Sequence, residues 1–102
     1  MSRRVYLATR DLLFRSKLGA VVAAAGGEIS RDEAACDLAV LDVDDRDIVG
    51  RIGKLVTQGI PVLAYGSHVR PALLAAARAA GATAVPNSQV LERLAEMIGA
   101  KP

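Results

Sequence analysis

Polar residues that could take part in chemistry follow the apolar segments of this 102-residue chain. The most acidic group is Asp42, Asp44 and Asp45, at the end of the apolar run DLAVLDV (37–43). Carboxylates at this spacing can bind a divalent cation or cap a helix. Three further groups each follow an apolar run, and they comprise Thr9, Arg10 and Asp11; Gly66, Ser67 and His68; Pro86, Asn87 and Ser88.

Other motifs with a known chemistry are missing from the sequence. It contains no GxxxxGK[ST] or GxGxxG segment, so no phosphate-cradling loop is expected. The single cysteine, Cys36, precedes an apolar run and is interpreted as a small buried hydrophobe rather than a reactive thiol. His68 is a candidate general base or anion contact, but no Ser/His/Asp set accompanies it, and a lone loop histidine is more often solvated. We therefore expect neither a cofactor nor a metal site.

Composition limits the class of protein. Hydrophobic residues make up 52% of the chain, and the near absence of aromatic residues requires a core of Ala, Val, Leu and Ile. This length allows one domain, which we expect to cover residues 1–102. A net charge of +2 and a pI near 9.0 give no argument for a nucleic-acid partner. No apolar stretch approaches the roughly 18 residues of a membrane span, and 18–27 fits a helix better than a secretion signal. A reducing cytoplasm fits best.

Hydrophobic periodicity predicts an alternation of strands and helices. Strands are expected at 4–9, 28–30, 37–43, 61–65 and 82–85. Helices are expected at 11–25, from Asp44 or Asp45 to Gly59, at 70–80 and from Asn87 or Ser88 to 98, with at most one or two helical turns at 31–36. The pattern indicates a (βα)5 domain, an α/β doubly wound parallel sheet with helices on both faces. In such sheets ligands bind outside the carboxyl ends of the strands, where the polar groups lie.

Three segments resemble the receiver domains of bacterial response regulators over residues 4–99. They are DLAVLDV (37–43), GIPVLAYGS (59–67) and ARAAGATAVPNS (77–88). The resemblance implies a flavodoxin-like, five-stranded sheet in the order 2-1-3-4-5, and it places Asp42 at the phosphoacceptor position. The chain is shorter than the family between Gly26 and Asp37, which implies a shortened second helix, and again after Asp42.

The positions that receivers use for phosphotransfer differ in this chain. Thr9 and Arg10 stand at the positions of the acidic pair, and Gly66, followed by Ser67, stands at that of the hydroxyl residue. Ser88 stands at the position of the lysine, and Val85 at that of the switch aromatic. Without the acidic pair, the hard oxygen ligands for Mg²⁺ are incomplete. The chain is therefore interpreted as a degenerate pseudo-receiver without enzymatic activity, not phosphorylated in the ordinary Mg²⁺-dependent way.

A partly desolvated carboxylate at the end of a central strand needs a compensating charge. We expect Arg10 to pair with Asp42 and to replace the metal. In the alternative, Asp42 caps the following helix beside Asp44.

Two other functions remain open. The run LDVDDRDIVGRI (41–52) looks like the DxD motif of Toprim domains, in which case Asp42 and Asp44 would bind metal for phosphoryl transfer and Asp11 would replace a missing glutamate. A receiver that can still be phosphorylated belongs to the same class. The third possibility is a small anionic ligand at the strand ends, held by Arg10, Ser67, Ser88 and helix N-termini.

The helix at 70–80 is richer in alanine than one buried face requires. The resemblance implies pairing through the fourth helix, the fifth strand and the fifth helix, so we expect a homodimer or protein-partner contact at Leu74, Ala75, Arg78 and Val85. The simpler explanation is that alanine is a strong helix former. The function we expect is protein–protein interaction in a regulatory or signalling context.

Overall fold

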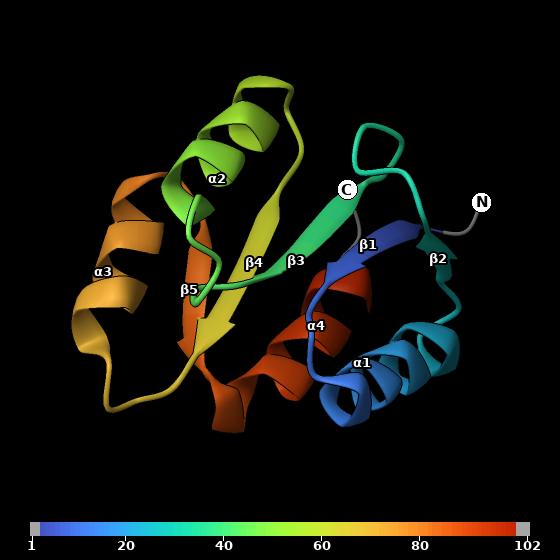
Figure 1. Ribbon diagram of the computed structural model, residues 1–102. Coiled ribbons are helices and arrows are strands. Elements are labelled where there is room, and N and C mark those ends of the chain that lie inside the picture. The colour runs from blue at the N-terminus through green and yellow to red at the C-terminus, as the bar shows by residue number, and fades with distance from the viewer. Residues whose placement is uncertain (1–2, 100–102) are drawn as a thin grey trace.

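Strands and helices alternate along the chain in the computed structural model, which describes residues 3–99 (Figure 1). Within these residues the strands are all parallel and lie in the order β2-β1-β3-β4-β5, which confirms the expected fold class. The elements are β1 (Arg4–Ala8), α1 (Leu12–Ala24), β2 (Glu28–Ser30), β3 (Leu38–Asp42), α2 (Ile48–Thr57), β4 (Val62–Gly66), α3 (Pro71–Ala79), β5 (Thr83–Pro86), a 3-10 turn η1 (Asn87–Gln89) and α4 (Val90–Gly99).

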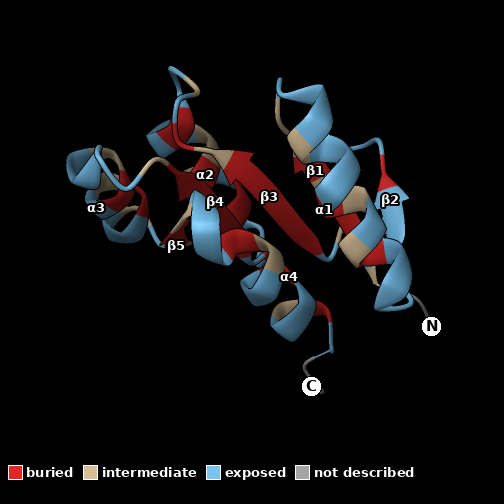
Figure 2. Ribbon diagram, turned by 90° about the horizontal axis from the view of Figure 1, so that it is seen from below, coloured by how far each residue is buried: buried red, intermediate tan, exposed pale blue. Residues whose placement is uncertain are grey.

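The central strands β3 and β4 are covered on both faces. Residues 38–41 and 62–66 are buried, and Figure 2 shows β3 as buried between helices whose outer surfaces are exposed. A nearly continuous apolar run is typical of such a strand. The parallel register pairs Asp42, the last residue of β3, with Tyr65 of β4.

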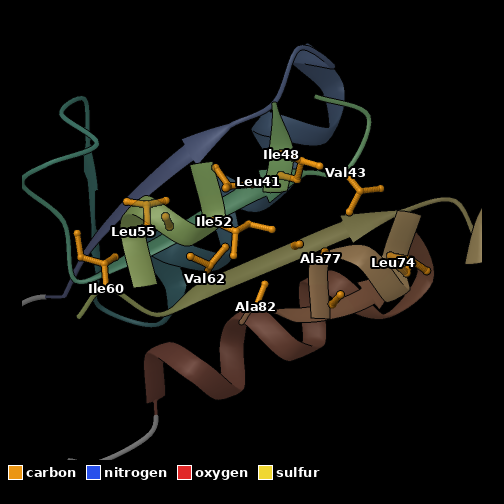
Figure 3. Close-up of a cluster of buried hydrophobic side chains, with 13 residues drawn as sticks. Leu41, Val43, Ile48, Ile52, Leu55, Ile60, Val62, Leu74, Ala77 and Ala82 are labelled. Carbon is orange, nitrogen blue, oxygen red and sulfur yellow. The ribbon is translucent and has the colours of Figure 1, made fainter. Parts of the chain in front are cut away.

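The sheet separates two apolar clusters. On one face, α2 and α3 pack on a cluster that includes Leu41, Ile52 and Ala64 (Figure 3). On the other face, α1 and α4 contact each other and cover a cluster that includes Val40, Leu63 and Tyr65. Alternate residues of β3 and β4 therefore contribute to opposite clusters, as the pleat of a strand requires.

The helix starts differ in part from the sequence expectations. α1 begins as expected, and the Asp11 carboxylate caps it by accepting a hydrogen bond from the Phe14 amide at 3.0 Å. The prediction that Asp44 or Asp45 caps the next helix is wrong, because α2 begins at Ile48 with Asp47 at the N-cap position. Residues 43–47 form turns instead, in which the side chains of Asp42 and Asp45 each accept a hydrogen bond from the amide two residues later.

Two other helical details also differ. Asn87 and Ser88 do not cap α4 directly, because they belong to the 3-10 turn that precedes it. The apolar spacing in α2 places Val56 on the same face as Ile52 and Leu55, yet Val56 is 40% exposed. Gly81 follows the C-cap of α3, and its φ of +112° explains why a glycine lies there.

The segment between β2 and β3 contains no helix within the described residues, so the one or two helical turns expected at 31–36 are reduced to a single turn. The Ala35 amide donates to the Asp32 carbonyl at 3.0 Å. The buried Ser30 hydroxyl lies 3.0 Å from the Asp32 carbonyl oxygen and 2.9 Å from that of Ala35. This turn connects β2 to β3.

Candidate functional site

Two hollows lie at the carboxyl ends of the strands, one on each face of the sheet. The α1-side hollow has a volume of about 190 Å³ and is lined by Asp11, Phe14, Asp42, Asp44, Tyr65, Gly66, Ser67 and Asn87. The α2-side hollow has a volume of about 310 Å³ and is lined by Tyr6, Ala8, Thr9, Arg10, Asp42, Asp44, Asp45 and Arg51. The strand-end residues singled out in the sequence thus line one or both of these hollows, except that His68, Pro86 and Ser88 line neither.

Asp42 borders both hollows. Its Oδ1 accepts a hydrogen bond from the Asp44 amide at 2.9 Å. Burial raises the pKa of Asp42, the charges of Asp44, Asp45 and Asp11 raise it further, and the hydrogen bond from the Asp44 amide opposes these effects. The ionised carboxylate is therefore poorly compensated in the folded protein.

The expected pairing of Arg10 with Asp42 is wrong. Arg10 is exposed, and no ion pair or hydrogen bond joins it to Asp42 in the described part of the chain. Arg10 lies beside the α2-side hollow, and its charge helps to lower the pKa of Asp45 instead. The alternative is correct only in part, because the Asp42 carboxylate stabilises the turn after β3 and does not cap α2.

Two other arginines compensate the neighbouring carboxylates. Arg51 of α2 forms ion pairs with Asp45 and, at 3.4 Å, with Glu33 of the turn that replaces the second helix. The hydrogen bond from the Asp47 amide and the Arg51 guanidinium lower the pKa of Asp45. Arg70 pairs with Asp44 at 3.0 Å, on the surface. Sequence reasoning missed Arg51 and Glu33, because partners 18 residues apart leave no local pattern.

An aromatic pair lies beside Asp42 on the α1 side. The rings of Phe14 and Tyr65 are stacked, with centroids 4.9 Å apart and an angle of 13° between their planes. Tyr65 is 3% exposed, and its buried hydroxyl forms no hydrogen bond of normal geometry with a described residue. Burial raises the pKa of Tyr65 to about 12, the charges of Asp42 and Asp11 add to the rise, and interaction of the hydroxyl with the Thr9 side chain opposes it. The aromatic residue in the apolar run 61–65 was the sequence signal that could have identified this group.

Comparison with known proteins gives results at the level of the fold. No protein-family model matches the sequence, and a search of curated proteins finds no significant match. Among solved structures, a putative response regulator from Chloroflexus aurantiacus superimposes with a TM-score of 0.78 at 18% identity, covering 99% of this chain and 100% of that one. This chain has the receiver fold.

Two further structures support the same conclusion. A CheY-like protein (tadZ) from Pseudomonas aeruginosa matches with a TM-score of 0.74 at 19% identity over 100% of this chain and 97% of that one. NtrX from Brucella abortus matches with a TM-score of 0.76 at 18% identity over 97% of this chain. The chain spans 27% of the length of that NtrX structure.

The remaining predicted site residues are Thr9, Ser67, Ser88 and Gly66. Thr9 accepts a hydrogen bond from the Asp11 amide at 3.3 Å, and Ser67 accepts one from the Val69 amide at 3.3 Å, so both hydroxyls take part in local turns. Ser88 is exposed in η1. At Gly66, a Cβ atom would lie 2.2 Å from Val43 Cγ2, so this strand end has no room for a side chain.

The residues predicted to form an interface divide into two groups. Leu74 and Val85 are 4% and 5% exposed and belong to the core, so their prediction as surface contacts is wrong. They point inward because they lie on the buried faces of α3 and β5. Ala75 and Arg78 are exposed on α3, and the Arg78 guanidinium donates to the Ala84 carbonyl at 2.8 and 3.2 Å.

Cys36 and His68 take no part in either hollow. Cys36 is partly buried, its thiol donates to the Glu33 carbonyl at 3.3 Å, and burial raises the pKa of the thiol. A raised pKa disfavours the nucleophilic thiolate. His68 is exposed in the segment after β4.

Within residues 3–99 no group of three or more His, Cys, Asp or Glu side chains is placed to hold a metal ion. No helix in this range has the length and apolar character needed to cross a membrane.

Proposed function

We propose that this chain is a regulatory module with the receiver fold that acts by protein–protein contact and does not transfer phosphoryl groups to Asp42 by the ordinary Mg²⁺-dependent route. The main support is the state of the acidic residues after β3. Asp44 is paired with Arg70 and Asp45 with Arg51, so the carboxylates next to Asp42 already have arginine partners within the chain. A divalent cation would have to displace these arginines before it could use either carboxylate.

The other positions around Asp42 support the same interpretation. Thr9 and Arg10 follow β1 where receivers have an acidic pair, and Ser88 replaces the lysine. The hydroxyl residue at the end of β4 cannot be restored by simple substitution, because Val43 fills the space beside Gly66. The same ion pairs disfavour the Toprim-like alternative, since Asp44 would be one of its metal ligands.

Exposed apolar side chains support a role in protein contacts. Leu12 and Leu13 at the start of α1 are 79% and 69% exposed, and Val69 after β4 is 71% exposed. These segments lie along the same edge of the molecule, where β4 ends and α1 begins (Figure 1). Large apolar side chains so exposed are candidates for a partner surface. A second candidate surface is the exposed side of α3 at Ala75 and Arg78, which would serve a homodimer.

Phosphorylation of the purified chain tests the proposal directly. The protein is incubated with Mg²⁺ and acetyl phosphate, and its intact mass is measured beside that of the Asp42→Asn variant. A receiver known to accept phosphate from acetyl phosphate shows that the reagent is active. We expect no added phosphoryl group on the wild-type chain. A phosphoryl adduct that Asp42→Asn abolishes would refute the proposal.

A further inference from the structure

The outward face of α1 is apolar, although the outer face of a surface helix is normally polar. Only residues 15–17 of this 13-residue helix are polar, and the segment 18–27 contains no charged residue. The outward side chains are nevertheless exposed along the whole helix (Figure 2). They are Leu12, Leu13, Ser16, Ala20, Ala23 and Ala24. A helix that is apolar on all sides is typical of one with neighbours on all sides.

Two exposed leucines distinguish α1 from the other helices. Leu12 and Leu13 are 79% and 69% exposed, more than any other large apolar side chain in a described helix. α3 is also rich in alanine, but none of its large apolar side chains is among the exposed ones in the described residues. α4 presents the charged side chains of Glu92, Arg93 and Glu96 to solvent. The face of α1 is therefore a stronger candidate for a protein contact than either of these helices.

Large and small side chains lie at opposite ends of this face. The two leucines are in the first turn, Ala23 and Ala24 are in the last, and Ser16 and Ala20 lie between them. When two copies of α1 pack antiparallel about their midpoint at Leu18, the leucines of each copy meet the alanines of the other. Parallel packing would place leucines against leucines and alanines against alanines, and it would leave a gap at one end. The face is thus complementary in shape to an antiparallel copy of itself.

The charges beside the face are complementary in the same arrangement. Arg15 and Lys17 are exposed in the first half of α1, and neither forms an ion pair with a described residue. The last turn of α1 has no basic residue to balance the negative end of the helix dipole. Glu28, at the start of β2, is exposed and has no ion pair with a described residue either. Antiparallel packing brings the basic half of each helix to the negative end of the other.

We infer that the outward face of α1 binds the same face of a second copy of this chain, with the two helices antiparallel across a two-fold axis. This inference rests on the proposed function, in which the chain acts by protein–protein contact, and it names a second copy as the partner. A two-fold contact uses the same patch on both subunits, which requires a patch that complements itself. A 13-residue helix is about 20 Å long, so the contact is small and belongs to the weak, reversible class.

Sedimentation equilibrium from micromolar to millimolar chain concentration tests the inference. We expect the wild-type chain to dimerise at the upper end of this range. Ala20→Glu keeps a good helix former and places a carboxylate in the middle of the face, so it should weaken self-association by about tenfold or more. Ala75→Glu makes the same change on the exposed side of α3 and should dimerise as the wild type does. Thermal unfolding shows that both variants are folded.

Cross-linking determines the direction of the two helices. Cys36 is replaced by alanine, and Leu13→Cys and Ala23→Cys are made in this background as two separate proteins. In antiparallel packing about Leu18, position 13 of one copy lies beside position 23 of the other, whereas the two copies of position 13 lie about 15 Å apart along the helix axes. A short bis-maleimide should therefore cross-link the mixture of the two proteins far more than either protein alone.

Four results would overturn the inference. They are a wild-type chain that stays monomeric at every concentration, equal self-association of Ala20→Glu and the wild type, loss of the dimer in Ala75→Glu but not in Ala20→Glu, and cross-linking of a single-cysteine protein alone to the same extent as the mixture. None of these measurements contains a phosphodonor. A failure here therefore leaves the absence of phosphotransfer untouched, and a phosphoryl adduct on Asp42 refutes the proposed function by a separate measurement.

Discussion

Val43 packs against Gly66 at the end of β4 and leaves no room for a side chain there. Adding one methyl group at position 66 tests this packing. In Gly66→Ala the new Cβ would lie 2.2 Å from Val43 Cγ2 and 3.7 Å from Leu74 Cδ2. Val43 and Leu74 are both buried in the α2/α3 cluster (Figure 3), so neither can move freely. Overpacking of this kind costs about 1–3 kcal/mol of the free energy of unfolding. For a domain near this size, each kcal/mol lowers the Tm by about 4–8 °C.

A compensating substitution makes the argument specific. Val43→Ala removes the methyl group that causes the collision, and alone it should destabilise the protein by about 1–3 kcal/mol, because it leaves a cavity. In the double variant the new methyl group at position 66 partly fills that cavity. We therefore expect the double variant to be more stable than the sum of the two single losses predicts, by about 1–3 kcal/mol.

Urea unfolding of the four proteins measures this coupling. Gly53→Ala serves as the control, because a Cβ at this position of α2 meets nothing within 4 Å. This control should gain about 0.5–1 kcal/mol, the usual advantage of alanine over glycine inside a helix. If the losses at positions 43 and 66 add to within about 0.5 kcal/mol, the proposed collision does not occur.

Further predictions concern the strand-end residues and α3. Tyr65→Phe should raise the free energy of unfolding by about 1 kcal/mol in urea unfolding, because it removes a buried hydroxyl that forms no hydrogen bond of normal geometry; a loss of stability would mean that the Thr9 side chain satisfies the hydroxyl. Because the pKa of Asp42 is raised above its ordinary value of 3.8, its ionisation opposes folding, so Asp42→Asn should stabilise the protein at neutral pH. That gain should disappear in unfolding measurements as the pH falls below 3.8, where the carboxyl is protonated in both states, and a gain independent of pH would contradict this assignment. Arg51→Ala should cost about 0.5–1.5 kcal/mol in thermal unfolding, because two partly exposed ion pairs are lost, whereas Arg46→Ala, on the exposed turn before α2, should have an effect close to zero. If α3 forms a homodimer, sedimentation equilibrium should find a dimer for the wild type and a monomer for Ala75→Glu, and a wild-type monomer would exclude this pairing.

The elements of the fold were predictable because their signals are local. The apolar run at 37–43 predicted a strand in a sheet with helices on both faces, and Gly59 marked the end of α2. The turn that replaces the second helix was not predictable in the same way. It depends on the buried Ser30 hydroxyl reaching two carbonyl groups, and nothing in the sequence of 31–36 reports that contact.

The position of the site was predictable from the sequence, but the ion pairs within it were less so. Topology alone places Asp42 and the residues after β1, β4 and β5 at one edge of the sheet. The ion pairs depend on the face of the sheet on which each loop side chain lies. Arg51 pairs with Asp45 and Arg70 with Asp44, whereas Arg10 lies on the α2 side. The contact between α1 and the end of β4 through Phe14 and Tyr65 is likewise a product of tertiary packing.

The division of the interior by the sheet has a consequence for how a bound partner would affect the molecule. Leu41 and Ala64 face α2 and α3, whereas their neighbours Val40 and Leu63 face α1 and α4. The central strands are thus the shared mechanical link between the two pairs of helices. A partner bound at the start of α1 is separated from α3 by these buried strands, so any effect of binding on α3 would have to pass through them.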